Sequence, residues 1–223
     1  MKTLCVIPAR LGSTRLPRKP LQQLAGMTLV EHTFAKASAC SAIDLVVVAT
    51  DSEEVMQVIE SAKGRAVMTD SAIKTGSDRV AAAAKQFPDF EIIINLQGDE
   101  PFIQPTMLAS IIEPFASDKT VQMSTLAFPF TDEAGYHSPD QVKVICDQQG
   151  DALYFSRSPI PYFRHHQDLT AVLHHMGVYA FRHDFLQTYS QLPQTPLEKA
   201  ESLEQLRALE HGYKIRVCPV NGN

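Results

Sequence analysis

The sequence predicts an α/β protein with a mostly parallel central sheet, on three observations. Short apolar runs alternate with segments of helical spacing through the first half of the 223 residues. Charged and hydroxyl-bearing residues follow several of these runs directly, where parallel strands would end. No apolar run approaches the ~18 residues that a membrane span requires. A chain of this length can form one large domain, or one domain with a subdomain.

The first half supplies the alternating elements. Strands are expected at 4–7, 45–49, 66–68 and 92–96, and helices at 29–38, 52–62 and 78–86. Ser52 is a suitable N-cap, with Glu53 and Glu54 in the first turn of its helix. Another helix is expected to begin at 104–106. These elements predict a parallel sheet covered by helices.

The pattern changes after residue 120. Strands are expected at 122–128, 141–146, 152–155 and 175–181, separated by turns rich in Pro and Asp. This spacing favours a mixed region with antiparallel strands. A long helix is predicted over 197–212, with leucines on one side and Gly212 as its stop, and a strand over 213–217 follows.

Charge and cysteine usage exclude several classes of protein. The net charge is −5 and the pI is about 5.9, without an extended basic face, which disfavours general nucleic-acid binding. The four cysteines are far apart and contain no Cys-x-x-Cys pair, so we expect buried thiols rather than a zinc site or disulfides. The N-terminus has no signal-peptide pattern, and we expect a cytoplasmic protein.

A basic loop follows the first expected strand. Residues 1–30 hold five basic side chains and no acidic one, and four of the five lie in the loop, together with Gly12 and Ser13: Arg10, Arg15, Arg18 and Lys19. Glycine permits close backbone approach, and cations neutralise phosphate. We interpret the loop as a polyanion site. The alternative is an exposed basic turn that binds nothing.

Two further strand ends carry acids. Asp99 and Glu100 follow the strand at 92–96, and Mg²⁺ in phosphate chemistry typically takes one or two carboxylates together with substrate phosphates. The alternative for Asp99 is an acid at a helix N-terminus. Asp51 follows the strand at 45–49 and could contact a ribose, although a helix cap is the favoured interpretation. Residues 74–79 combine helix-cap residues with a small polar shelf around Gly76.

These stretches together resemble one family. Residues 7–21 (IPARLGSTRLPRKPL) are similar to the N-terminal signature of the sugar-activating cytidylyltransferases, and within that group to those that activate 3-deoxy-manno-octulosonate (Kdo). Segments 75–79 (TGSDR), 95–101 (NLQGDEP), 175–179 (HMGVY) and 203–207 (LEQLR) extend the resemblance, which covers 3–217. It implies a three-layer, Rossmann-like (GT-A-like) nucleotidyltransferase with a smaller mixed-β dimerisation and sugar-binding subdomain at about 122–181.

The resemblance also implies a reaction and its residues. CTP and Kdo would give CMP-Kdo and diphosphate in a Mg²⁺-dependent homodimer on the route to lipopolysaccharide, by attack of the sugar 2-hydroxyl on the α-phosphate. The implied catalytic residues are Arg10, Arg15, Lys19 and Asp99, with Asp99 also the metal ligand. The implied CTP contacts are Ala9, Arg10, Ser13, Lys19, Gly76, Ser77, Arg79 and Gln97. The implied Kdo contacts are Arg79, Gln97, Arg157, His175, Tyr179, Glu204 and Gln205.

Some of these assignments have alternatives in which the residue binds no ligand. Arg157 could form an ordinary surface ion pair, and Glu204 could belong to a solvated helix face. The segment at 75–79 exchanges the family's two hydroxyl types, and the family's histidine near Ile73 is missing. The family's C-terminal motif with its second metal-binding aspartate is also missing, so we expect a truncated chain or an incomplete metal site.

Two other functions stay open at this point. An N-acylneuraminate cytidylyltransferase is disfavoured because its loop usually reads Ala-Arg-Gly-Gly-Ser-Lys. A non-catalytic nucleotide-binding protein is favoured only by the missing second aspartate.

Overall fold

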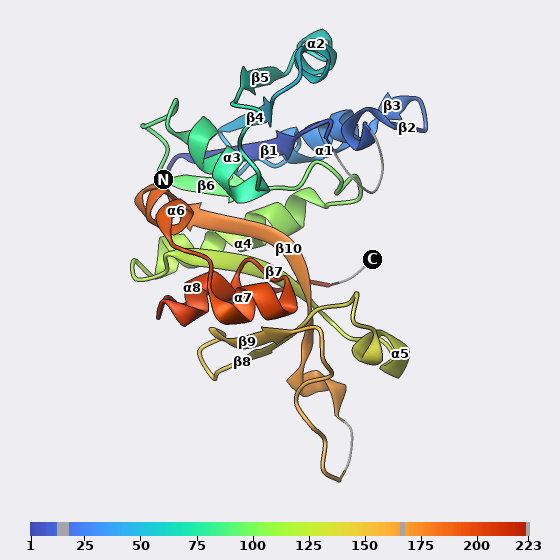
Figure 1. Cartoon of the computed structure of the whole chain (residues 1–223), viewed down its shortest axis with the longest axis vertical. Helices are drawn as coiled ribbons and strands as arrows, with labels where there is room; N and C mark the ends of the chain where they lie inside the picture. Colours follow the sequence, from blue (N-terminus) through green and yellow to red (C-terminus); the bar gives the residue numbers. More distant parts are fainter. Residues whose placement is uncertain (13–17, 166–167, 222–223) are drawn as a thin grey trace. The chain divides into compact units, whose positions relative to one another are not determined.

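The computed structural model describes residues 1–12, 18–165 and 168–221. Ser13 and Arg15, two of the predicted site residues, lie outside the described residues. The chain divides into two compact units, one of residues 1–112 with 178–190 and the other of residues 113–177 with 191–223. Figure 1 shows the elements of both units. Below, the two are called the first and the second unit.

The first unit contains the predicted parallel sheet. Its strands are β1 (Thr3–Ala9), β4 (Leu45–Thr50), β5 (Arg65–Met68), β6 (Ile92–Asn95) and the second half of β10 (Leu173–Arg182). Their order is β10-β6-β1-β4-β5, with β6, β1, β4 and β5 parallel and β10 antiparallel to β6. Residues 4–7 and 92–94 are wholly buried. The four strands expected in the first half of the sequence are therefore confirmed.

Four helices of the first unit follow the prediction, and a fifth, α6 (His183–Gln191), was not predicted. The predicted ones are α1 (Leu29–Ser38), α2 (Glu53–Ser61), α3 (Gly76–Ala84) and α4 (Pro105–Ser117), which begins in this unit and ends in the second. Ser52 caps α2 by accepting a hydrogen bond from the Val55 amide, as predicted. A one-turn 3-10 helix, η1 (Lys19–Leu21), and the hairpin of β2 (Gln23–Leu24) and β3 (Met27–Thr28) precede α1.

The second unit is mixed, as expected. It contains β7 (Met123–Pro129), β8 (Lys143–Cys146), β9 (Ala152–Ser156), β11 (Arg216–Pro219) and the first half of β10. Strands β7 and β11 are parallel, whereas β8 is antiparallel to both β9 and β10. Its helices are α5 (Glu133–His137), α7 (Pro196–Glu201), α8 (Leu206–Glu210) and the 3-10 helix η2 (Leu169–Ala171).

The long helix predicted over 197–212 is wrong. The chain forms α7 and α8 instead, and Ser202 between them has a left-handed backbone with φ of 53°. The leucine spacing continues across the break, which is why the pattern indicated one helix. Gly212 ends the segment with φ of 81°, as predicted, and the last strand begins at Arg216 rather than at residue 213.

Two further findings concern the chain as a whole. None of the helices formed by the described residues is long and apolar enough to cross a membrane. Cys5, Cys40 and Cys218 are buried free thiols, as expected, and Cys146 is a half-buried one.

Candidate functional site

The ends of β1 and β6 in the first unit are held in close backbone contact. A Cβ atom added to Gly98 would lie 3.2 Å from the Pro8 carbonyl oxygen, so a side chain there would force the two strand ends apart. The buried Thr33 hydroxyl of α1 donates to the Gly98 carbonyl at 3.2 Å. The loops that follow both strands therefore start from one rigid edge of the sheet.

Lys19 and Asp99 meet at this edge as an ion pair. The Lys19 ammonium contacts one Asp99 carboxylate oxygen, and both side chains are partly exposed, at 37% and 40%. The prediction that the basic loop and this aspartate share a sheet edge is confirmed. The neighbouring Glu100 has a pKa raised by burial and then by the charge of Asp99, which Lys19 partly offsets.

The other described cations of the loop contact different elements. The exposed Arg10 donates through Nη1 to the Lys74 carbonyl at 2.9 Å, which ties the loop to the segment before α3. Arg18, with a left-handed backbone at φ of 56°, pairs with Glu54 of α2. Arg10 and Lys19 thus carry positive charge to the same edge from opposite ends of the loop.

A polar shelf lies beside the pair, at the start of α3. Thr75 caps the helix by accepting from the Asp78 amide at 3.1 Å. Asn95 donates to Ser77 Oγ at 3.1 Å and accepts from Gln97 Nε2 at 3.0 Å. A Cβ atom added to Gly76 would lie 3.4 Å from Gln97 Oε1, so the Gly76 backbone packs closely against the Gln97 side chain.

Tyr179 joins the shelf by strand register. It lies directly opposite Asn95 in the antiparallel pairing of β10 with β6, and opposite residues point to the same face of a sheet. Sequence reasoning missed Asn95, the buried amide that connects Ser77 to Gln97. The signal was present, since Asn95 is the polar residue that closes an otherwise apolar strand.

Arg79 of α3 forms an ion pair with Asp51, which follows β4. Arg79 is 1% exposed, and its Nη2 donates to Asp51 Oδ2 at 3.0 Å and to the Ile73 carbonyl at 3.3 Å. Its Nη1 donates to Thr69 Oγ1. The favoured interpretation of Asp51 as a helix cap is wrong, because Ser52 caps α2. The structure gives Arg79 protein partners, and its contact with a ligand stays a prediction.

His175, in the second unit, is a buried neutral ring. It is 8% exposed, its Nε2 lies 3.0 Å from Thr125 Oγ1, and its ring contacts Phe155 edge-on at 4.9 Å between centroids. Burial lowers the pKa of His175 to about 3, with His174 adding to the effect. The ring can therefore donate one hydrogen bond and accept another, but it carries no charge at neutral pH.

Arg157 is held by backbone carbonyls of the same unit. Its Nε donates to the Glu201 carbonyl at 2.8 Å and its Nη1 to the Pro139 carbonyl at 3.0 Å. Among the described residues no carboxylate lies within 4.0 Å of this guanidinium. The alternative of an ordinary surface ion pair is therefore wrong.

Glu204 and Gln205 lie in the turn between α7 and α8. Gln205 is 2% exposed, and the Glu204 side chain is 31% exposed with Oε1 3.8 Å from Arg207 Nη2. The alternative that Glu204 belongs to one solvated helix face is wrong, because that helix is broken at Ser202. Both residues instead lie in the turn that begins at Ser202, whose backbone is left-handed.

The chemistry of Asp99 fits a magnesium ion. The described residues contain no group of three His, Cys, Asp or Glu side chains that could hold a metal by themselves. Mg²⁺ needs fewer, since it binds through one or two carboxylates together with substrate phosphates and water. Asp99 is half exposed and already holds one cationic group, the Lys19 ammonium. A single carboxylate beside the basic loop fits such a donor set, with the phosphates supplied by a substrate.

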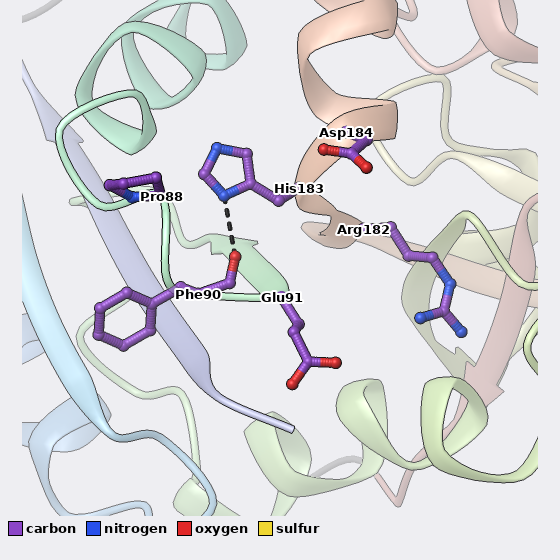
Figure 2. Close-up of a pocket in the computed structure, with 6 residues that line it drawn as sticks. All are labelled: Pro88, Phe90, Glu91, Arg182, His183 and Asp184. Atoms are coloured by element: carbon purple, nitrogen blue, oxygen red, sulfur yellow. Dashed lines mark hydrogen bonds between the residues drawn. The ribbon is translucent and has the colours of Figure 1, made fainter.

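The opposite edge of the same sheet carries a pocket of about 410 Å³ (Figure 2). Pro88, Phe90 and Glu91 line it just before β6, and Arg182, His183 and Asp184 line it where β10 leads into α6. His183 Nδ1 lies 2.9 Å from the Phe90 carbonyl oxygen, so this ring fixes the junction. The pocket contains none of the predicted site residues.

Comparison with known proteins gives consistent matches. The family model described as "Cytidylyltransferase" matches residues 4–215. A 3-deoxy-manno-octulosonate cytidylyltransferase of Acaryochloris marina is 47% identical over 218 residues, covering 98% of this chain and 89% of that protein. Another enzyme of this name, from Chlorobium chlorochromatii, is also 47% identical, covering 97% of this chain and 88% of that protein.

Solved structures agree with these matches. A CMP:2-keto-3-deoxy-manno-octonic acid synthetase complexed with CTP is 40% identical, has a TM-score of 0.95, and covers 100% of this chain and 91% of its own. A 4-diphosphocytidyl-2C-methyl-D-erythritol synthase from Anaerococcus prevotii has a TM-score of 0.62 at 17% identity, covers 100% of this chain and 88% of its own, and shares the fold alone.

The parallel sheet, the basic loop after its first strand and the acid after a neighbouring strand define a nucleotidyltransferase of the α/β class. Within that class, the chain belongs to the cytidylyltransferase family.

Proposed function

We propose that the chain is a 3-deoxy-manno-octulosonate cytidylyltransferase, which converts CTP and Kdo into CMP-Kdo and diphosphate. The observation that carries the proposal is the contact between Lys19 and Asp99, a cation and a carboxylate at adjoining strand ends. Relatives at 47% identity bear this name, and a structure with a TM-score of 0.95 was solved with CTP.

The proposed reaction is a single in-line displacement. The 2-hydroxyl oxygen of Kdo bonds to the α-phosphorus of CTP, the bond from that phosphorus to the bridging oxygen breaks, and diphosphate leaves with the bonding electron pair. The hydroxyl proton passes to water. Arg10, Arg15 and Lys19 are proposed to neutralise the charge that develops on the leaving group, so the chain contributes positioning and electrostatics rather than a covalent intermediate.

Asp99 is proposed to hold Mg²⁺. When bound, the ion would screen the triphosphate and lower the pKa of the attacking hydroxyl. Lys19 would then be available to the phosphates, because the ion would take over the neutralisation of the Asp99 charge that Lys19 provides in this structure. The polar shelf of Gly76, Ser77 and Gln97 is proposed to bind the cytidine part of CTP, supported by its amide and hydroxyl groups.

The remaining parts of the proposal rest on resemblance. Kdo is an acidic sugar, and Arg157 is proposed to pair with its carboxylate because bidentate arginine suits that geometry. His175, Tyr179, Glu204 and Gln205 are proposed to contact its hydroxyl groups. A homodimer in the cytoplasm is expected on the same basis.

Diphosphate release in the presence of CTP, Mg²⁺ and Kdo tests the proposed function. We expect release to depend on Kdo, and N-acetylneuraminate supplied at the same concentration to be turned over at least ~100-fold more slowly, because a site built for one sugar leaves polar groups unpaired with another. Preferred use of N-acetylneuraminate would identify the sialic-acid enzyme. Binding of CTP without release for either sugar would identify a non-catalytic protein.

A further inference from the structure

We propose that Glu201, with support from Lys143, is a positioning residue that orients Arg157 for the carboxylate of the acidic sugar. The inference rests on the proposed function and deepens it, because nothing in the sequence comparison assigns these two residues. In the sequence, Lys143 is a single cation between Val142 and Val144. Both belong to the second unit, as does Arg157.

Glu201 contacts the strand end that carries Arg157 at three points. Its Oε1 accepts from Ser156 Oγ at 2.6 Å, and its Oε2 accepts from the Arg157 amide at 2.9 Å. Its own backbone carbonyl accepts from Arg157 Nε at 2.8 Å. One residue therefore fixes both the backbone and the guanidinium of Arg157.

Lys143 fixes the same segment from the other side. It is 0% exposed, and its Nζ donates to the carbonyls of Arg157, Gln141 and Ser138 at 2.6, 2.8 and 2.8 Å. All three ammonium hydrogens thus have partners, which is the requirement for burying this group. The 138–141 turn also supplies the Pro139 carbonyl that accepts from Arg157 Nη1. Lys143 therefore holds a second acceptor of the guanidinium in place.

The result is an oriented cation with spare donors. Five N–H groups belong to a guanidinium. Nε and one N–H of Nη1 are used, and the described part of the chain gives Arg157 no partner at Nη2. Two carbonyl dipoles orient the charge without neutralising it. The unused N–H donors of Arg157 suit an anion with two adjacent oxygen atoms, such as the carboxylate of a sugar.

Glu201 also connects Arg157 to the turn that follows. It is the last residue of α7, and Ser202 begins the turn that contains Glu204 and Gln205. Among the predicted sugar contacts, a change of the Glu201 side chain removes a hydrogen bond of Arg157. None of the cytidine-shelf residues belongs to this network.

The test is Glu201→Gln, with diphosphate release measured while Kdo is varied at saturating CTP. Glutamine keeps the size of the side chain but has one acceptor oxygen instead of two. We expect the KM for Kdo to rise about tenfold, the effect of losing one hydrogen bond to a charged group, with kcat and the KM for CTP within about twofold of wild type. The matched control is Glu210→Gln, since Glu210 accepts from the Leu197 and Glu198 amides at the other end of α7 and does not touch Arg157.

A double-mutant cycle separates positioning from general damage. If Glu201 acts through Arg157, Glu201→Gln adds no further rise in the KM for Kdo once Arg157→Ala is present. A full additional tenfold, or an unchanged KM in the single variant, overturns the proposal. Should Glu201→Gln not fold, Ser156→Ala removes the hydroxyl that donates to Glu201 and accepts from the Ser158 amide at 3.0 Å. We expect the KM for Kdo to rise about threefold in this variant, and an unchanged KM refutes the role of Glu201. Absence of release by the wild-type chain refutes the proposed function itself.

Discussion

Two ion pairs, one in each unit, show how differently the same chemistry can be used. Lys19 and Asp99 of the first unit are 37% and 40% exposed. Glu198 and Arg207 of the second unit are 6% and 5% exposed, and Arg207 contributes two hydrogen bonds, through Nε at 2.9 Å and through Nη2 at 2.5 Å. Glu198 belongs to α7 and Arg207 to α8, two short helices that are labelled in Figure 1.

Burial decides what each pair does for the molecule. An exposed pair contributes roughly 0–1 kcal/mol to stability, because water and salt screen it. A buried pair repays its desolvation only with good geometry, and breaking it costs about 3–5 kcal/mol because one charge is left without a partner. Burial raises the pKa of Glu198, but hydrogen bonds from Arg207 and from the Thr195 amide outweigh this and hold the pKa below its usual value. The exposed pair is thus free to exchange partners with a ligand, and the buried pair is structural.

The largest expected effect is on catalysis at the exposed pair. Asp99→Asn removes the charge that is proposed to hold Mg²⁺, and we expect kcat/KM to fall about 10³-fold while the free energy of unfolding changes by less than about 1 kcal/mol. Steady-state diphosphate release and urea unfolding measure the two effects. Asp89→Asn, at an exposed carboxylate of the same unit, is the control and should change neither. Near-normal turnover of Asp99→Asn with Mg²⁺ would sink the assignment.

The next effect is on stability at the buried pair. Arg207→Met keeps an unbranched apolar stem but removes the charge that pairs with the Glu198 carboxylate, so we expect the free energy of unfolding to drop by about 3 kcal/mol. Urea denaturation measures it. Lys214→Met is the comparison, because Lys214 is 75% exposed and pairs with Asp151 at 3.0 Å; a loss below about 1 kcal/mol is expected. Equal losses in the two variants would contradict the contrast drawn from burial.

The sequence predicted the first of these pairs but not the second, for a geometric reason. Parallel strands end at the same sheet edge, so an acid after one strand and cations after its neighbour were expected to meet, and Lys19 and Asp99 do. Glu198 and Arg207 are nine residues apart, which is about 13.5 Å along a continuous helix. Their contact exists only because the helix is broken at Ser202, and the sequence has no Gly or Pro over 197–211 to predict that break.

Long-range partners account for most of what else was missed. The pairing of Arg79 with Asp51 joins a helix to a strand end 28 residues earlier, and only packing decides which acid it meets. The contacts of Glu201 with Ser156 and Arg157 span more than 40 residues. Apolar periodicity locates strands and helices but contains no information on which turn lies beside which strand end.

A third effect concerns acid and the buried histidine of the second unit. His175 has a pKa of about 3 when folded and 6.5 when unfolded, so between these values the unfolded chain binds a proton that the folded chain does not. Stability from this group is complete above pH 6.5 and is lost as the pH falls, by about 1.4 kcal/mol per pH unit. His175→Gln should lose this slope, so denaturation of both proteins between pH 7 and pH 4 measures it. An equal dependence of the free energy of unfolding on pH in the two proteins would show that folding does not lower the pKa of His175.

The smallest effect tests whether the polar shelf of the first unit tolerates one added methyl group. Gly76 is the first residue of α3, and its φ is not positive, so Gly76→Ala should raise the free energy of unfolding by about 0.5–1 kcal/mol by restricting the unfolded chain. Its Cβ would lie 3.4 Å from Gln97 Oε1, in the space proposed for cytidine, so the KM for CTP should rise about threefold with kcat unchanged. Gly212→Ala is the matched change of opposite sign, because φ of 81° strains any L side chain and about 1 kcal/mol of stability should be lost there. An unchanged KM for CTP in Gly76→Ala would move the cytidine away from this shelf.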